Sequence, residues 1–466
     1  MVLPCFFKGQ LRRLFQMSDK RTEILGSMDI KKSLFKLAIP AIIGMLINAV
    51  YNVVDRIYVG KLGTEALAAT NVVFPLFALI GAVGLTFGLG AGSYVSRLLG
   101  QGNKELAQRT ASTAIFSSMA CGLGYTLIGL FFIVPILKFF GASETAMAYA
   151  VDYGKYLTMG AIFTMMNMTM NNLLRSEGSP MIAMLSMLTG AIMNIILDPI
   201  FIFGLKLGIS GAAIATVISQ MISTLLLLSY YLRGKSALRI HFKFVTFSLA
   251  LYGQIMKIGT PTFLRQVLAS LSLVIVNHAA KSFGDSALAA IGIVNIIFLM
   301  AFYVLFGFNQ GFQPLAGYNY GAKNYKRLNE AIRIAIIWAS LYCIIITIIF
   351  TAFATPIVGA FSDDPAVLSI ATKGLRVFSI LLPFMGFILM ITGLYQALGH
   401  AIGAAVLSLS RQGIFLIPTV LILPRFFGID GIIFSQLVAD FLTLIVCTAF
   451  AMNIIKKLKK EELNMQ

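Results

Sequence analysis

The sequence is poor in charged side chains. Asp, Glu, Lys and Arg make up only 12% of its 466 residues, whereas 58% of the residues are hydrophobic, and the mean hydropathy is +0.88. A soluble domain of this length could not bury so much apolar surface. The composition therefore excludes an ordinary soluble protein and indicates a chain that lies largely within a membrane.

Residues of metal, redox and catalytic sites are also scarce. Three histidines lie far apart, and four cysteines show neither disulfide nor metal-ligand spacing: Cys5, Cys121, Cys343 and Cys447. This pattern indicates no metal centre and no convergent nucleophile and base. The alternation of apolar and polar residues that is typical of outer-membrane barrels is missing as well.

Long apolar stretches are abundant. A membrane-spanning helix needs about 20 apolar residues, and about twelve stretches come near that length. They cover 34–59, 67–98, 110–138, 145–174, 180–204, 209–232, 251–280, 288–318, 328–353, 366–397, 400–424 and 429–454. The predicted fold class is an all-α polytopic membrane protein with about twelve transmembrane helices.

The two halves of the chain repeat one another at a constant spacing. Pro40 recurs as Pro261, which is a spacing of 221 residues (261−40), and the segment 63–69 recurs at the same spacing as 284–290. No gap is needed to align the halves. Each half has an even number of stretches, so we predict two pseudo-symmetric six-helix lobes related by an axis along the membrane normal.

The net charge of +18 could indicate nucleic acid, but its placement favours a membrane protein. Basic residues gather before the first stretch and after the second, sixth, eighth and last, which is the positive-inside pattern. We therefore expect a multi-pass protein of the cell (inner) membrane with both termini in the cytoplasm. The expected parts are a cytoplasmic N-terminal segment (1–33), a first lobe (34–232), a cytoplasmic linker (233–250), a second lobe (251–454) and a cytoplasmic tail (455–466).

Ionisable residues within a span are costly and mark functional positions by default. Asp55 falls opposite Val276 in the repeat, so this charge occurs in one copy only. Asp55, Asp198 and Thr216 fall at similar depths in the outer half of the membrane, and Asn194 lies on the same helix face as Asp198. Two carboxylates, an amide and a hydroxyl predict a site for Na⁺, or for a proton shared by the carboxylates. No other cofactor is expected.

The second half carries three charged residues near the membrane midplane, Arg265, Arg411 and Asp440. A buried Arg–Asp pair is expected there, because an unpaired charge would be expensive. The sequence leaves open whether these residues serve structure or transport.

Several motifs resemble the MATE (multidrug and toxic compound extrusion) transporter family. They are the segments 40–60, 62–69, 90–97, 194–199 and 211–216. The resemblance implies a MATE/MOP-type fold and an antiporter of drugs or organic cations. The position of Asp55 resembles the DinF-like branch, whose first-lobe site would correspond to Asp55, Asn194, Asp198 and Thr216. The neighbourhood of Arg265 and Gln266 holds no acid, which disfavours coupling through the second lobe.

The same resemblance assigns roles to further residues. Pro40 corresponds to the family's bend-forming proline in the first span. Five residues match positions near the substrate cavity of the family: Asn48, Tyr51, Asn167, Asn171 and Met187.

We expect a secondary active multidrug efflux transporter that exports amphipathic, cationic organic compounds in antiport with Na⁺ or H⁺ by alternating access. Its partners would be small-molecule substrates and membrane lipids, not nucleic acid, and we expect a monomer. The alternative is a flippase for lipid-linked or polysaccharide precursors, which predicts a more strongly cationic cavity than the first lobe shows. A channel and a membrane enzyme are less favoured, because neither a charged ring or filter repeat nor a catalytic set occurs.

Overall fold

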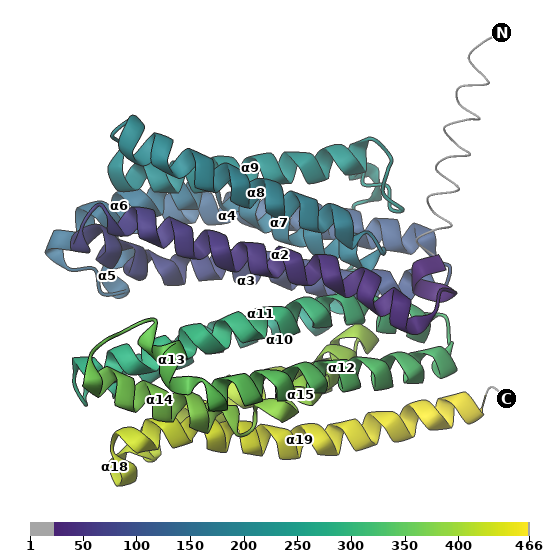
Figure 1. Cartoon of the computed structure of the whole chain (residues 1–466). Coiled ribbons are helices and arrows are strands. Elements are labelled where there is room, and N and C mark those ends of the chain that lie inside the picture. Colours follow the sequence, from purple (N-terminus) through teal and green to yellow (C-terminus); the bar gives the residue numbers. More distant parts are fainter. Residues whose placement is uncertain (1–22, 465–466) are drawn as a thin grey trace.

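A computed structural model of the protein describes residues 23–464, and within that range all regular secondary structure is helical. The long helices run roughly side by side (Figure 1). Ten described helices are long and apolar enough to cross a membrane. An eleventh is formed if α14 (Pro365–Ser379) and α15 (Leu382–Leu398), bent by 54°, count as one span. The predicted all-α polytopic fold is confirmed.

The first half of the chain follows the expected stretches closely, but the stretch 110–138 is divided at Phe132 and the stretch 145–174 is divided at Gly160. Its helices are α2 (Ile30–Gly60), α3 (Thr64–Gly100), α4 (Lys104–Phe131), α5 (Ile133–Phe139), α6 (Glu144–Met159), α7 (Ala161–Ser176), α8 (Pro180–Pro199), the π segment η1 (Ile200–Gly204) and α9 (Gly208–Leu232). The expected stretch 145–174 is divided at Gly160 into α6 and α7. A Cβ at residue 160 would overlap Val217 of α9, so glycine allows α9 to approach the break.

The second half begins after a short 3₁₀ turn, η2 (Phe242–Phe244). Its helices are α10 (Leu249–Lys281), α11 (Asp285–Gly321), α12 (Tyr325–Ala352), α13 (Ala354–Gly359), α14, α15, α16 (Ala401–Leu409), the π segment η3 (Ser410–Leu416), α17 (Ile417–Ile422), α18 (Pro424–Phe427) and α19 (Ile429–Leu463). The expected stretch 400–424 is therefore a series of short pieces, and the last helix continues beyond 454.

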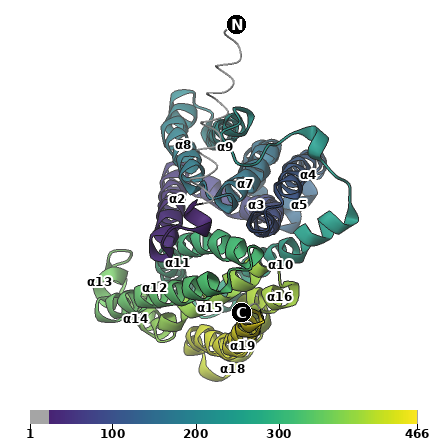
Figure 2. The same cartoon turned by 90° about the vertical axis from the view of Figure 1, so that its right-hand side faces the viewer.

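The two halves lie as separate layers, with α2 to α9 above α10 to α19 in Figure 1, and the end-on view of Figure 2 shows the same division. The helix α2 begins, and α19 ends, at the same end of the bundle (Figure 1). This arrangement places a long interface between the halves.

The layers meet most closely near the end of the bundle where α2 begins. Gly90 of α3 lies against the backbone of Ile255 in α10, and Gly311 of α11 lies against the backbone of Ala38 in α2. A Cβ at either glycine would overlap that backbone. Glycine is therefore what allows these helices of opposite halves to touch.

A stripe of glycines also fixes α7 within the first half. Gly84, Gly88 and Gly92 recur every four residues along α3, and each faces α7. Small residues at this spacing let two membrane helices pack with their backbones in close approach. The stripe thereby sets the position of α7, which carries Asn167 and Asn171.

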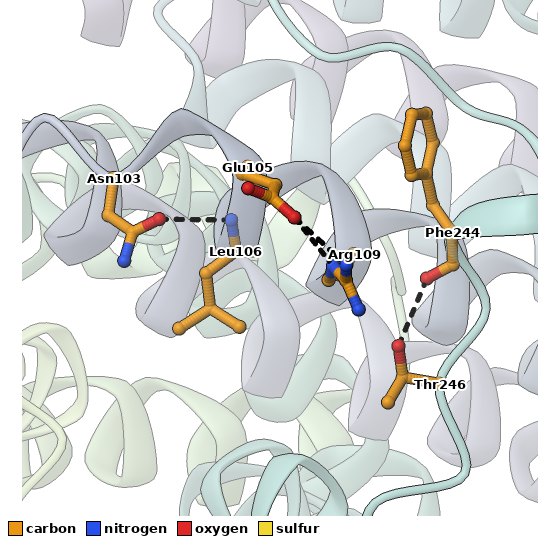
Figure 3. Close-up of polar contacts among 6 residues, drawn as sticks. All are labelled: Asn103, Glu105, Leu106, Arg109, Phe244 and Thr246. Carbon is orange, nitrogen blue, oxygen red and sulfur yellow. Dashed lines mark hydrogen bonds and ion pairs between the residues drawn. The ribbon is translucent and has the colours of Figure 1, made fainter.

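The turns after α3 and α11 act as matching helix caps. Asn103 accepts a hydrogen bond of 3.1 Å from the backbone three residues on, and Arg109 pairs with Glu105 at 2.9 Å in the first turns of α4 (Figure 3). Asn324 caps α12 in the same way, at 3.2 Å. These side chains satisfy backbone donors that a helix start leaves free.

The helix α2 continues through Pro40 as one helix. Pro40 has no N–H, so the carbonyl of Lys36 loses its ordinary helical partner. The missing hydrogen bond is a weak point in the backbone ladder of α2, and the hinge at Pro40 stays a prediction.

Candidate functional site

Three helices of the first half bring four of the predicted residues together. Asp55 comes from α2, Asn194 and Asp198 come from successive turns of α8, and Thr216 comes from α9. The side-chain amide of Asn194 donates to Asp198 Oδ1 at 3.1 Å and to Thr216 Oγ1 at 3.3 Å. Asp198 is fully buried and Asn194 nearly so. We refer to these four residues as the carboxyl cluster.

The carboxyl groups of Asp55 and Asp198 lie close enough to interact with each other. Asp55 Oδ1, Asp198 Oδ2 and Asn194 Oδ1 are buried and receive no N–H or O–H from any described residue. Two carboxylates have no hydrogen to share, so such a contact requires a proton on one of them or a cation between them. The cluster therefore has the donor set for either.

The backbone beside the cluster departs from a regular α-helix. Asp198 is followed by Pro199 and then by the π segment η1, a feature often found at functional sites. A Cβ at Gly211 would overlap the backbone of Phe201, so α9 packs directly on this segment. That packing places Thr216, about one and a half turns further along α9, next to Asn194.

A cavity of about 100 Å³ adjoins Asp55. Its wall includes Asp55, Arg56, Tyr153 and Thr216. The cavity provides room for a small hydrated species beside the carboxyl groups, since a single water needs only about 10–15 Å³ of such space.

A larger cavity of about 490 Å³ lies between the two halves; we call it the central cavity. All five residues that the sequence assigned to a substrate cavity line it: Asn48, Tyr51, Asn167, Asn171 and Met187. Tyr51 and Thr216 belong to the walls of both cavities. The carboxyl cluster therefore borders the space that a substrate would enter.

The amides of the central cavity are held by their neighbours. Asn167 Nδ2 donates to Ser223 Oγ at 2.6 Å, and Asn171 Nδ2 donates to Asn167 Oδ1 at 2.6 Å. Asn171 Oδ1 is buried without a partner among residues 23–464. The wall thus offers a fixed acceptor among apolar side chains, which is typical of small-molecule sites.

The charged residues in the central cavity's wall are Arg175 of α7 and Arg265 of α10, and none of the described lining residues is Asp or Glu. The first lobe contributes one positive charge to this cavity, because Arg175 faces inward from the last turn of α7. Sequence analysis assigned no role to Arg175, since it stands at the edge of an expected stretch. The one sequence feature that could have indicated Arg175 is that it is a basic residue close to the end of an expected helix.

The predicted midplane charges of the second half divide into two groups. Arg411, in η3, donates from Nε to Asp440 Oδ1 of α19 at 2.7 Å, and Gln436 donates to the same oxygen at 2.8 Å. The Arg411 guanidinium also lies 4.7 Å from the ring centroid of Phe302. Arg265 stands apart from this pair and lines the central cavity.

Groups of three or more His, Cys, Asp or Glu suited to a metal ion do not occur among residues 23–464. The oxygen-rich carboxyl cluster suits a hard monovalent cation or a proton, because carboxylate, amide and hydroxyl oxygens are its donors. Cys121, Cys343 and Cys447 are free thiols, and Cys5 lies outside the described residues.

Comparison with known proteins places the chain in a family. The MatE profile matches residues 40–200 and 261–422, so its two copies begin at Pro40 and Pro261. The chain is 32% identical over 447 residues to the multidrug export protein MepA of Staphylococcus haemolyticus, covering 95% of this chain and 97% of that protein.

Two solved structures agree with the fold. A multidrug resistance MATE family transporter of the MOP superfamily, in an outward-facing conformation, has a TM-score of 0.90 and 27% identity, with 95% of this chain and 99% of that chain covered. A MOP superfamily transporter from Pyrococcus furiosus, described as having a binding pocket of reverse polarity, has a TM-score of 0.88 and 27% identity, with coverage of 94% and 98%. The chain therefore belongs to the MatE family, and it is a multi-pass membrane transporter rather than an enzyme.

Proposed function

We propose that this protein is a secondary active multidrug efflux transporter that exports amphipathic organic compounds, cations among them. The observation that carries the proposal is the pair of facing carboxyl groups, Asp55 and Asp198, beside a cavity between the two halves. Such a pair binds a proton or a cation reversibly, which is the property that ion-coupled transport requires. The similarity to multidrug export proteins supports the choice of substrates.

The coupling ion in this proposal is Na⁺ or H⁺, held by Asp55, Asn194, Asp198 and Thr216. Binding of the ion lowers the negative charge of the carboxyl pair and draws α2 toward α8. Because Pro40 weakens the backbone ladder of α2, this pull is relieved by bending the helix there. The bend reshapes the wall that Asn48, Tyr51 and Met187 contribute to the central cavity, and the compound is released.

In this proposal of alternating access, the central cavity opens to one side of the membrane while the other end of the bundle is closed. The contacts at Gly90 and Gly311 close the end where α2 begins. Arg97 of α3 adds a hydrogen bond of 3.2 Å to the carbonyl of Ala397 at the end of α15. With both termini in the cytoplasm of an inner-membrane protein, this is the cytoplasmic side. The protein works as a monomer whose lobes rock so that these contacts separate when the opposite end closes.

The test is dye efflux from proteoliposomes under separately imposed Na⁺ and H⁺ gradients. Wild-type protein should respond to one gradient, whereas Asp55→Asn should lose that response. Asp363→Asn, which alters an exposed loop carboxylate, should behave as wild type. Gradient-driven efflux at the wild-type rate in Asp55→Asn would overturn the proposal, whereas a uniform loss in both variants would show that the carboxyl cluster has no special part.

A second candidate is a flippase for lipid-linked or polysaccharide precursors, and the two arginines of the central cavity favour it. Such precursors carry phosphates, which arginine binds well. A fluorescent lipid-linked diphosphate that crosses the membrane of proteoliposomes at a rate dependent on Arg265 would support this candidate, and its failure to cross would exclude it.

A further inference from the structure

The central cavity contains a cationic group that the coupling scheme does not use. Arg175 is only 7% exposed, and its guanidinium donates to the side-chain oxygen of Gln310 and lies 3.7 Å from Met187 Sδ. Neither neighbour carries a negative charge. Arg265, on the opposite half, makes no hydrogen bond or ion pair with any residue of the described range.

A guanidinium remains protonated in proteins. A charge within the membrane is costly unless it is paired, and it marks a functional position by default. The other arginine within a span of the second half, Arg411, is half-buried and has its counter-ion in Asp440. Arg175 and Arg265 have no such counter-ion in the wall of the central cavity, so their charge is compensated best by an anion that enters the cavity.

We infer that Arg175 and Arg265, which come from opposite halves and both line the central cavity, bind the anionic group, a carboxylate, of the transported compound. This inference rests on the proposed function, because it assumes that the central cavity holds the substrate.

The surroundings of Arg175 fit this role. Gln310 and Gln313 of α11 line the cavity beside it, and Gln313 donates to the side chain of Gln396 at 3.0 Å. Gln396 is the repeat equivalent of Arg175 (396−175 = 221). The duplicated position therefore carries a positive charge in one half and a neutral amide in the other. The wall of the central cavity is for this reason more positive on the side of Arg175 than on the side of Gln396.

The rest of the cavity suits the body of such a compound. Phe74, Phe77 and Phe306 contribute aromatic surface. Asp55 of the carboxyl cluster lines the adjoining small cavity, which shares Tyr51 and Thr216 with the wall of the central cavity. A zwitterion meets arginines at one place and carboxyl groups at another, whereas a simple cation leaves both arginines unpaired.

Rhodamine B and its ethyl ester provide a matched pair of probes. They share one ring system, but rhodamine B is a zwitterion with a free carboxylate at neutral pH and the ester is a cation. Binding of each dye to the purified full-length protein is measured by fluorescence anisotropy, and efflux of each is measured in proteoliposomes. The variants are Arg265→Gln, Arg175→Gln and Arg265→Lys, with Arg109→Gln as the control because it lies at the exposed start of α4.

Wild-type protein should bind rhodamine B more tightly than its ester. Arg265→Gln and Arg175→Gln should weaken rhodamine B binding about 10- to 100-fold, as expected for loss of a charge-assisted hydrogen bond, and leave binding of the ester within about twofold. Arg265→Lys should retain part of the preference, and Arg109→Gln should retain all of it. If a Gln variant fails to fold, Arg265→Lys and the remaining variant still decide the matter.

Equal weakening of both dyes, or a wild-type preference for the ester, would overturn the subsite. So would displacement of rhodamine B by phosphatidylglycerol through the same arginines, since the occupant would then be a lipid phosphate. The proposed function can fail separately. Arginine-dependent binding without efflux of either dye would support the subsite and contradict the transport function. Efflux of both dyes without discrimination would support the transport function and contradict the subsite.

Discussion

The carboxyl groups of Asp55 on α2 and Asp198 on α8 are close neighbours that interact with each other. Each carries an oxygen that no described residue supplies with a hydrogen. In a membrane interior two such groups do not both remain charged and unpaired. The pair is thus a place where a proton or a cation changes the interaction between two helices of the same half.

Asp198→Asn should leave the protein folded and remove its response to the coupling ion. The new amide can donate to Asp55, so the buried contact is kept without a shared proton or cation. Wild-type protein should melt at a higher temperature with the coupling ion than without it, because a ligand that binds the folded state stabilises that state. The shift should vanish in Asp198→Asn. The measurement is thermal unfolding in detergent with and without Na⁺ and at two pH values, and a shift equal to that of wild type would contradict the assignment.

Asn194→Leu should weaken ion coupling about tenfold or more, because it removes the donor to Asp198 and leaves a buried carboxyl without that hydrogen bond, a loss of about 1–3 kcal/mol. The measurement is the concentration of the coupling ion that gives half-maximal efflux. Thr189→Val is the matched control on the same helix, since Thr189 is partly exposed and bonds only to the backbone of Leu185. An unchanged ion requirement in Asn194→Leu would remove Asn194 from the site.

Pro40→Ala should slow efflux about tenfold while substrate binding is retained, if α2 bends at this residue. Alanine restores the missing backbone hydrogen bond and stiffens the helix, an effect of up to about 3 kcal/mol. Pro261→Ala makes the equivalent change in α10, where Val276 replaces the carboxylate of Asp55. We expect the second variant to slow efflux much less, and equal slowing in both would argue against a special hinge in α2.

Asp440→Asn should destabilise the protein by several kcal/mol, because it leaves Arg411 buried without its counter-ion; removing one partner of a buried pair typically costs about 3–5 kcal/mol. Adding Arg411→Gln to this variant should recover part of the lost stability. Expression level and thermal unfolding measure both steps. If the second change brings no recovery, Arg411 and Asp440 do not depend on each other.

Length, hydropathy and the repeat were enough to predict most helices, because an apolar stretch of about 20 residues has few other stable structures in a membrane. The similar depth of Asp55, Asp198 and Thr216 in the membrane also predicted that they lie near one another, and the structure brings them together. Among the features that escaped prediction, two are instructive. The break at Gly160 depends on contact with Val217 of another helix, which no local pattern reveals.

The second missed feature is the direction of the arginines. The sequence grouped Arg265 with Arg411 and Asp440 by depth alone, but rotation about the helix axis decides which side chains meet. The structure pairs Arg411 with Asp440 and turns Arg265 toward the central cavity, together with Arg175. The rotation of each helix about its axis is set by packing against its neighbours, as at the glycine stripe of α3. A single sequence does not state directly which helices pack together.

The most direct test of ion coupling through Asp55 and Asp198 is to let the substrate drive the ion. Proteoliposomes without any imposed ion gradient are loaded with a transported dye, and ion movement against the dye flux is followed with a pH-sensitive probe and with radioactive sodium. Wild-type protein should move H⁺ or Na⁺ opposite to the dye, and the double variant Asp55→Asn, Asp198→Asn should move neither. The same ion flux in the double variant as in wild type would contradict the account.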